Sequence, residues 1–308
     1  MIGVAGTLVV DVSAATVATI PRVGRMAPVD SISLHTGGAA GNTGATLSRL
    51  GVPVAVMASV GDDDLGAFAI GRVRRWAREV LVRKDPNRST SASVVVVHED
   101  GERTFLHALG ASSGFTAADI PLEHLVDQGA RALHVGYALF LPAFDGAPMV
   151  ETFREAHALG LLVSLDVAWK PRSDWRSLRS VLEHVDLFCP NLKEAVEITG
   201  CRDAASAAEA LLASGVRQAV AVTLGTDGCF LKTREAGRHL PGHPMTAVDT
   251  TGAGDAFIAG LLAAWYRGLS WEDAARVANA TGAAATTRAG AAEEDLDWES
   301  VVAISQGS

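Results

Sequence analysis

The feature that most constrains this fold is a repeated alternation of short apolar runs and amphipathic segments. The runs at 52–60, 132–135 and 161–167 predict buried strands, and segments with apolar residues at helical spacing follow them, several closed by glycine. A chain that repeats strand and helix in this way builds a mostly parallel sheet with helices on both faces. We therefore expect a doubly wound α/β fold, with its ligands at the carboxyl ends of the strands.

One part of the chain interrupts this alternation. Two short runs that favour β-strands flank a glycine-containing turn at 98–102, which predicts a β-hairpin. This hairpin interrupts the sequence of β-α units. We expect a single α/β domain over residues 1–308, with a small β-strand appendage contributed by about 13–36 and 90–108.

The composition excludes several classes of protein. Of 308 residues, 48% are hydrophobic and 20% charged, which argues against wholesale disorder. A net charge of −9 repels a phosphate backbone, so nucleic acid is not an expected partner. Three cysteines without C-x-x-C spacing predict neither a disulfide framework nor a zinc site. No Lys or Arg precedes Arg22 and no apolar run approaches the ~20 residues of a membrane span, so we expect a cytoplasmic protein without membrane partners.

The strongest local signal is the segment DTTGAGDAF at 249–257, a glycine-rich turn that leads into a predicted helix. Backbone amides in the first turn of a helix lack partners within the helix and lie at the positive end of its dipole, so an anion is expected there. Asp255 would lie beside that anion, where it could take a proton from an attacking hydroxyl. Phosphoryl transfer needs these parts. The alternative is an ordinary tight turn in which Asp255 caps the helix.

A second small-residue turn, GGAAGN at 37–42, leads into a helix predicted at 41–50. It lacks the Lys-Ser/Thr ending of a Walker loop and matches G-x-G-x-x-G poorly, so nucleotide binding has little support there. Asn42, together with Asp11 at the end of a strand predicted over 2–10, could bind the hydroxyls of a polyol. The alternative for Asn42 is an N-cap of the helix.

Taken together, these segments resemble the PfkB, or ribokinase-like, family of ATP-dependent carbohydrate and nucleoside kinases. The resemblance covers essentially the whole chain. The segments at 37–51 and 249–257 are similar to the N-terminal and C-terminal signatures of the family, at the expected distance apart. Intermediate segments that agree are GDDDLG at 61–66, DGER at 100–103, PNLKE at 190–194 and TLGTDG at 223–228.

The resemblance implies roles on the side of the phosphate donor, ATP. Asp255 is the expected general base. The backbone groups expected to form an anion hole for the γ-phosphate are those of Gly252, Ala253 and Gly254. Asp249 and Thr251, with carbonyls near 285–290, match the loop that binds K⁺ in many members.

Further positions match elements of the family that lie around the nucleotide. Asn191 and Glu194 correspond to an Asn-x-x-Glu element that helps to place Mg²⁺ and the phosphates, through water as Mg²⁺ tends to prefer. The remaining positions expected to border ATP are Thr223, Gly225, Gly228 and Asn279.

On the acceptor side, Asp11, Gly38 and Asn42 match positions that bind substrate hydroxyls in similar kinases. The appendage resembles the family's β-lid, which closes over the acceptor. Lids of relatives often pair between subunits, and unpaired lid strands would expose open edges, so we expect a homodimer through the lid. Arg103, at the hairpin tip, could approach the phosphates on closure or be a solvated turn residue.

Two departures bear on the acceptor. Ribokinases carry Asn where this chain has Val9, which weakens a ribose assignment. Many sugar kinases of the family carry Asp-Pro-Asn where this chain has DVA at 166–168, so that Asp166 is retained but its neighbours differ. Tyr137 and Phe140 could stack on a sugar or base, although such residues more often pack in the core. We expect a sugar kinase that transfers the γ-phosphate of ATP to a hydroxyl of a monosaccharide or sugar acid. The alternative is a nucleoside kinase, because an apolar residue at Val9 also occurs in similar nucleoside kinases.

Two other classes remain as alternatives outside the kinases. A catalytically silent binding protein with this fold is disfavoured by the presence of Asp255. A dinucleotide-dependent oxidoreductase is disfavoured because no early strand leads into G-x-G-x-x-G.

Overall fold

A large sheet of nine strands forms the centre of the computed structural model, which describes residues 1–17, 19–98, 103–168, 175–287 and 296–307. The strands are β1 (Ile2–Gly6), β4 (Val54–Gly61), β5 (Glu79–Asp85), β8 (Ala132–Ala138), β9 (Leu162–Val167), β10 (Leu187–Phe188), β11 (Ala219–Thr223), β12 (Cys229–Thr233) and β13 (Gly237–Leu240). Their order is β13-β12-β11-β10-β9-β8-β1-β4-β5. From β11 to β5 all neighbours are parallel, and β12 and β13 add an antiparallel edge.

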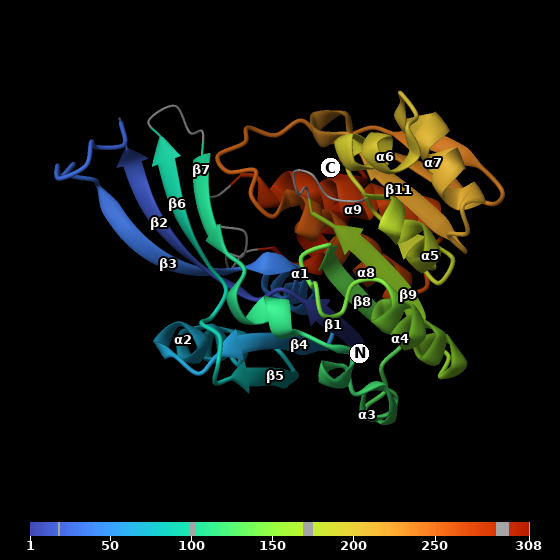
Figure 1. Ribbon diagram of the computed structural model, residues 1–308. Helices are drawn as coiled ribbons and strands as arrows, with labels where there is room; N and C mark the ends of the chain where they lie inside the picture. Colours follow the sequence, from blue (N-terminus) through green and yellow to red (C-terminus); the bar gives the residue numbers. More distant parts are fainter. Residues whose placement is uncertain (18, 99–102, 169–174, 288–295, 308) are drawn as a thin grey trace.

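Helices cover both faces of this sheet (Figure 1). On one face lie α1 (Gly38–Arg49), α2 (Asp64–Val73), α8 (Ala253–Tyr266), α9 (Trp271–Ala285) and α10 (Trp298–Ser305). On the other lie α3 (Leu122–Asp127), α4 (Ala147–Ala158), α5 (Arg179–Leu182), α6 (Leu192–Thr199) and α7 (Ala204–Ala213). Where we expected one helix at 175–184, the chain forms a 3-10 turn at Trp175–Leu178 followed by α5.

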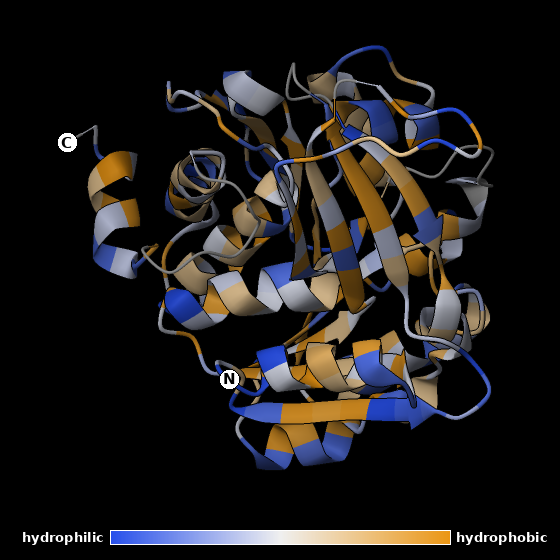
Figure 2. Ribbon diagram, turned by 90° about the vertical axis from the view of Figure 1, so that its left-hand side faces the viewer, coloured by the Kyte–Doolittle hydropathy of each residue, from blue (hydrophilic) through white to orange (hydrophobic). Residues whose placement is uncertain are grey.

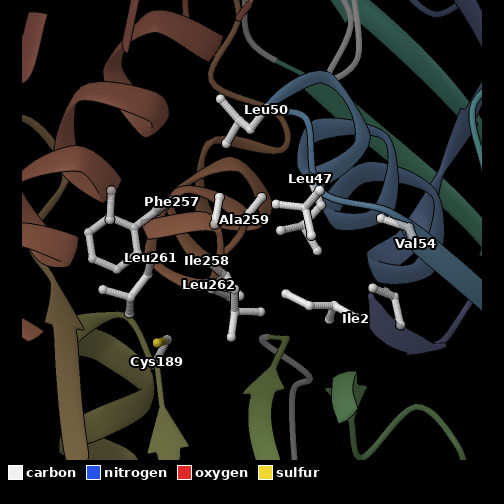
Figure 3. Close-up of a cluster of buried hydrophobic side chains, with 14 of the residues drawn as sticks. Ile2, Leu47, Leu50, Val54, Cys189, Phe257, Ile258, Ala259, Leu261 and Leu262 are labelled. Atoms are coloured by element: carbon white, nitrogen blue, oxygen red, sulfur yellow. The ribbon is translucent and has the colours of Figure 1, made fainter. Parts of the chain in front are cut away.

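The core explains why the strands are apolar on both sides. Ile2 and Val54 pack into the cluster shared with α1 and α8 (Figure 3), whereas Ala5 and Met57 of the same strands pack toward the opposite layer. Successive side chains of a strand point to opposite faces, so a sheet covered on both faces requires continuous apolar runs. The side chains that α8 contributes in Figure 3 include Phe257, Ile258, Leu261 and Leu262. This packing holds the N-terminus of α8 in a fixed position.

A smaller sheet projects from one side of the molecule (Figure 1). Its strands, in spatial order, are β3 (Ser31–Gly37), β2 (Val9–Val17), β6 (Ala92–His98) and β7 (Arg103–Ala108). β2 and β6 are parallel, and the two outer pairs are antiparallel. The turn expected at the hairpin tip, 99–102, lies outside the described residues. We call these four strands the small sheet.

The small sheet corrects one expectation about the N-terminus. The run at 2–10, predicted as one strand, is divided between the two sheets, because β1 ends at Gly6 and β2 begins at Val9. Asp11 therefore lies within β2 and not at the end of a strand of the large sheet. Both halves of the run are buried, so their apolar character conceals the change of sheet.

The fold class predicted from the sequence is confirmed: a doubly wound, mostly parallel sheet lies between helices and carries a smaller sheet. In the described part of the chain, no helix has both the length and the apolarity needed to cross a lipid bilayer.

Candidate active site

The turn before α8 presents free backbone donors. Gly252 is the N-cap of α8 and has a left-handed backbone with φ 76°, a conformation that glycine adopts without strain. In the described part of the chain, the amides of Gly252 and Gly254 have no hydrogen-bond acceptor. The third amide expected in the anion hole, that of Ala253, instead donates to the Thr250 carbonyl at 3.2 Å. A Cβ at Gly254 would meet no atom within 4 Å. The first turn of α8 therefore opens onto space, as an anion site requires.

This space is a cleft of about 1080 Å³. Ala253 and Gly254 line one part of it, and His239, Pro241 and Met245 line another. Four residues predicted to border ATP are also in its wall, namely Thr223, Gly225, Gly228 and Asn279. A volume of this size exceeds the usual 300–1,000 Å³ of ligand pockets, so it has room for a nucleotide.

Two of the predicted nucleotide residues shape this cleft through contacts with the backbone. Gly228 has φ 89°, and a Cβ there would lie 2.2 Å from the carbonyl oxygen of Leu240. Asn279 donates from Nδ2 to the carbonyls of Leu240 and Pro241, at 3.1 and 3.0 Å. Both residues thus hold the segment after β13 against the large sheet.

Asp255 is buried, 3% exposed, and it accepts three hydrogen bonds. Its Oδ2 accepts from Asn42 Nδ2 at 2.8 Å and from the Tyr137 hydroxyl at 2.9 Å, and its Oδ1 accepts from Thr43 Oγ1 at 3.4 Å. Burial raises the pKa of Asp255, and the hydrogen bonds oppose that rise. Since Gly252 is the N-cap and the carboxylate makes no capping bond, the alternative role as a helix cap is wrong.

Asn42 connects α1 to this carboxylate. We predicted that the helix would begin at residue 41, but α1 begins at Gly38, so Asn42 lies inside it and is not its N-cap. Gly38 has φ 77°, and a Cβ there would lie 2.4 Å from the Thr7 carbonyl oxygen. The Asn42 side chain is buried, and in the described structure its Oδ1 has no hydrogen-bond partner. A buried amide oxygen without a partner indicates a missing donor, which a ligand hydroxyl would supply.

Asp11 belongs to a polar row that crosses all four strands of the small sheet. The register of the four strands places these residues side by side, in the order His35, Asp11, Ser93 and His107. Burial raises the pKa of Asp11, while a hydrogen bond with Ser93 and the two histidines oppose the rise. His107 contacts Phe140 edge to face, with 6.2 Å between ring centroids, so this row faces the main body of the molecule.

Tyr137 lies between these groups, at the end of β8. Its φ of 60° is unusual for a residue with a side chain. Burial raises its pKa well above the ordinary value, and the charges of Asp255, Asp166 and Asp11 raise it further. The predicted base and the predicted acceptor residue therefore both lie near the same phenol.

Asn191 and Glu194 contact each other in a capping box at the start of α6. The Glu194 amide donates to Asn191 Oδ1, and the Asn191 amide donates to Glu194 Oε2, each at 2.9 Å. Asn191 also pairs in parallel with Thr223, which lines the cleft. Burial raises the pKa of Glu194 to about 7. Burial also raises the pKa of Asp166 well above its usual value, and the charges of Glu194 and Asp255 add to this rise.

Asp249 and Thr251 contact a side chain from the small sheet. Arg103 Nη2 lies 2.5 Å from Asp249 Oδ2, and Arg103 Nη1 donates to Thr251 Oγ1. Arg103 is thus not a solvated turn residue. The two side chains expected to bind K⁺ are occupied by a guanidinium group, so in this arrangement they do not fit that ion. Of the carbonyls expected to join them, those of residues 288–290 lie outside the described structure.

Sequence reasoning missed part of this arrangement. No sequence pattern indicates Thr43, which contacts Asp255, and the sequence predicts only stacking or packing for Tyr137, although its hydroxyl contacts Asp255 as well. For Asp166 the sequence indicates only a residue shared with the family. A polar residue at the end of a predicted parallel strand, as Tyr137 and Asp166 are, is the signal that could have found them.

Comparisons with known proteins show the family of this chain. The profile of the pfkB family carbohydrate kinases matches residues 1–298. A 2-dehydro-3-deoxygluconokinase of Bacillus subtilis (strain 168) is 29% identical over 273 residues, which cover 84% of this chain and 83% of the relative. Fructokinase-1 of Oryza sativa subsp. japonica is 27% identical over 269 residues, 83% of each chain.

Solved structures share the fold. A ribokinase of Arabidopsis thaliana, complexed with ribose and ATP, has a TM-score of 0.83 at 22% identity, and the match covers 100% of this chain and 99% of that one. Because the family match spans nearly the whole sequence, this chain belongs to the pfkB family of carbohydrate kinases, phosphotransferases that act on a sugar hydroxyl.

Proposed function

We propose that this protein transfers the γ-phosphate of ATP to a hydroxyl of a monosaccharide or sugar acid, with Asp255 as the general base. One observation carries the proposal. Asp255 follows directly after Gly254, which lines the large cleft, and its carboxylate contacts Asn42 and Tyr137 on the side of the small sheet. A base between a nucleotide and an alcohol needs this position.

The chemistry follows from the groups around Asp255. An acceptor hydroxyl would replace Asn42 or Tyr137 as a donor to Oδ2, and its oxygen would attack the γ-phosphorus. The new oxygen–phosphorus bond forms as the bond from the γ-phosphorus to the β,γ-bridging oxygen breaks, the proton passes to Asp255, and ADP leaves. The free amides at Gly252 and Gly254 would bind the oxygens of the transferring group, whose charge they stabilise.

Mg²⁺ fits the acidic groups near the cleft. Asp166 and Glu194 are buried carboxyls with raised pKa values, and each would be stabilised as a carboxylate by a nearby dication. The described residues contain no group of three or more His, Cys, Asp or Glu that could hold a metal by themselves. We infer that Mg²⁺ would bind mainly to phosphates and water, with Asn191 and Glu194 holding that water. The bound ion would neutralise the charge of the phosphates.

For the acceptor, the polar row of the small sheet and Asn42 supply donors and acceptors suited to several hydroxyls. Asp11 accepts, and Asn42 Oδ1 has no donor among the described residues. His35 and Ser93 flank Asp11 in the row, and His107 follows Ser93. Gly38, which was expected to join them, is packed against Thr7, whose carbonyl oxygen would lie 2.4 Å from a Cβ at this position. The relatives named as a 2-dehydro-3-deoxygluconokinase and a fructokinase support a sugar or sugar acid.

A substrate panel tests this proposal. ADP release would be measured with monosaccharides, sugar acids and nucleosides, each at several concentrations with ATP and Mg²⁺. We expect one sugar or sugar acid to exceed every nucleoside in kcat/KM by about 10²-fold or more, because a site built for hydroxyls rejects molecules that leave its polar groups unpaired. Fastest turnover of adenosine, inosine or cytidine would instead establish the nucleoside kinase. Tight sugar binding without ADP release from any acceptor would indicate a silent binding protein.

The outer face of the small sheet supports a homodimer as part of the proposal. One apolar row crosses the four strands of the small sheet and consists of Leu34, Val12, Val94 and Leu106. Each of these residues is next in sequence to a residue of the polar row, and successive side chains of a strand point to opposite faces, so the apolar row lies on the opposite face of the sheet. Leu106 is 66% exposed, and Leu34 and Val94 are each 44% exposed. Figure 2 shows hydrophobic stretches along these strands. A second copy of the same sheet would cover this row.

Sedimentation measurements test the dimer. We expect the mass of two chains at micromolar concentration, and the mass of one chain for Leu106→Asp, with an unchanged circular dichroism spectrum. A monomeric wild-type protein would contradict this part of the proposal.

A further inference from the structure

We propose that Arg103 supplies the positive charge beside Asp249 for which the family resemblance implied K⁺. The guanidinium group is then a resident cation, and Arg103 is a positioning residue that connects the small sheet to the turn before α8. The inference rests on the proposed anion-binding role of that turn, and its test is chosen so that either can fail alone.

The contacts of Arg103 are specific. One terminal nitrogen lies 2.5 Å from Asp249 Oδ2, and the other donates to Thr251 Oγ1. The side chain of Arg103 is 22% exposed and that of Asp249 is 4% exposed. A carboxylate buried to this extent requires a cationic partner, and the planar guanidinium binds two acceptors at once with a fixed geometry.

These contacts extend to the backbone that leads into α8. The second carboxylate oxygen of Asp249, Oδ1, accepts from the amide of Thr251 at 2.8 Å. The Asp249 amide donates to the Thr286 carbonyl at 3.0 Å, which attaches the same residue to the end of α9. Gly252, with its free amide, follows directly after Thr251. Arg103 therefore fixes the two residues that set the direction of the proposed anion-binding amides.

The same contacts leave no role for K⁺ at these side chains. A cation bound to Asp249 would lie next to a guanidinium group, and like charges at that distance repel. Either the arginine or the ion can neutralise Asp249. The structure has the arginine there.

Arg103 also relates this turn to the acceptor side. It begins β7, whose partner strand β6 carries Ser93 of the polar row. Burial raises the pKa of Asp11, and the charge of Arg103 is among those that oppose the rise. One side chain thus interacts electrostatically with Asp11 and directly with the turn before α8.

The test compares wild type, Arg103→Met and Arg103→Lys in KCl and in choline chloride of equal ionic strength. Steady-state kinetics would be measured with the best acceptor, and thermal unfolding would be measured without substrates. Arg25→Met is the matched control, because it removes an exposed arginine between β2 and β3.

For wild type and the control variant we expect less than a twofold change of kcat between the two salts, and the same unfolding midpoint in both. Arg103→Met should lose kcat on the order of tenfold to a hundredfold in choline chloride, as misplaced catalytic groups do. KCl should restore part of this activity and raise the unfolding midpoint of this variant alone. Arg103→Lys should retain more activity than Arg103→Met, because it keeps the charge.

Two results would overturn the proposal: a wild-type enzyme that K⁺ activates tenfold or more, or an Arg103→Met variant with wild-type kinetics. A loss in Arg103→Met that neither K⁺ nor the lysine variant relieves would also overturn it, since it would indicate a structural role only. If no acceptor is phosphorylated, the proposed function fails, and the unfolding midpoints in the two salts still decide the role of Arg103.

Discussion

Two glycine turns lead into two helices of this molecule, and they are built alike but used differently. Each contains a left-handed glycine, Gly38 at the first position of α1 with φ 77° and Gly252 directly before α8 with φ 76°. A Cβ at Gly38 would lie 2.4 Å from a backbone oxygen of Thr7, whereas a Cβ at Gly254 would meet nothing within 4 Å. The first turn is therefore packed against protein, and the second faces the cleft.

The comparison separates two uses of small residues. Before α1, the missing side chains let protein groups approach, as at Gly37, where a Cβ would lie 2.3 Å from Asp11 Oδ2. Before α8, they leave room for a ligand. The two helices then meet where Asn42 donates to Asp255. A small-residue pattern alone does not distinguish these uses, since the space around each missing Cβ decides between them.

The largest expected effect is at the residue where the two helices meet. Asp255→Asn removes the proposed base without changing the size of the side chain, so kcat should fall by about 10²–10⁴-fold. ATP affinity, measured by calorimetry, should change little, because the anion-binding amides remain. Near-normal turnover in this variant would contradict the role of Asp255, whatever its effect on stability.

A pair of substitutions tests the comparison directly. Gly254→Val should leave the thermal midpoint nearly unchanged and raise the KM for ATP by about tenfold or more, because its side chain projects into the cleft. Gly38→Ala should leave the KM for ATP nearly unchanged and should destabilise the fold. Its φ of 77° and the contact with Thr7 should lower the free energy of unfolding by about 1–3 kcal/mol.

Calorimetric unfolding and steady-state kinetics on both variants decide the outcome. If Gly254→Val proves as destabilising as Gly38→Ala, the turn before α8 is a packed turn like the other. If Gly38→Ala is as stable as wild type, the close approach to Thr7 is not needed for folding.

The acidic group beside the cleft should make stability depend on pH. Burial raises the pKa of Glu194 from 4.5 to about 7, so the folded protein binds this proton more tightly than the unfolded chain. Its contribution to the free energy of unfolding is therefore full below about pH 4.5 and is lost as pH rises through about pH 7. Glu194→Gln keeps the capping box but cannot titrate. Between about pH 5 and pH 8, the unfolding midpoint of Glu194→Gln should fall less than that of wild type. If the two proteins show parallel plots of midpoint against pH, the pKa of Glu194 is not raised.

Much of the fold could be predicted from the sequence, because its signals are local. Runs such as 52–60 and helix ends such as Gly200 depend on burial and backbone geometry within a few residues. The division between β1 and β2 could not be predicted, since Val9 and Val10 are as apolar and buried as Ile2. Nothing in such a run distinguishes which sheet each half will join.

The same distinction between local and long-range features holds for the candidate site. Asp255 and the glycines beside it could be proposed because they form one short segment whose chemistry depends on the start of a helix. The partners of that segment could not. Asn42 is 213 residues from Asp255, and Arg103 is 148 residues from Thr251. The first pair depends on how α1 and α8 pack against each other on the large sheet, and the second on how the small sheet lies against the large one. A single sequence carries no periodic signal for either arrangement.

The smallest expected effect concerns the third donor to Asp255. Tyr137→Phe removes the hydrogen bond at 2.9 Å, which lowers the pKa of Asp255 against the effect of burial. Without it, that pKa should rise. A base must be ionised to accept a proton, so the acidic limb of the kcat profile should move to higher pH, with a loss of only a few-fold near neutral pH. Tyr266→Phe is the matched control, because that hydroxyl accepts from the Met1 amino group, 3.0 Å away, and should leave the limb unmoved. A limb that does not move in Tyr137→Phe would mean that Asn42 and Thr43 alone set the ionisation of the base, and that the turn before α1 controls the chemistry at the turn before α8.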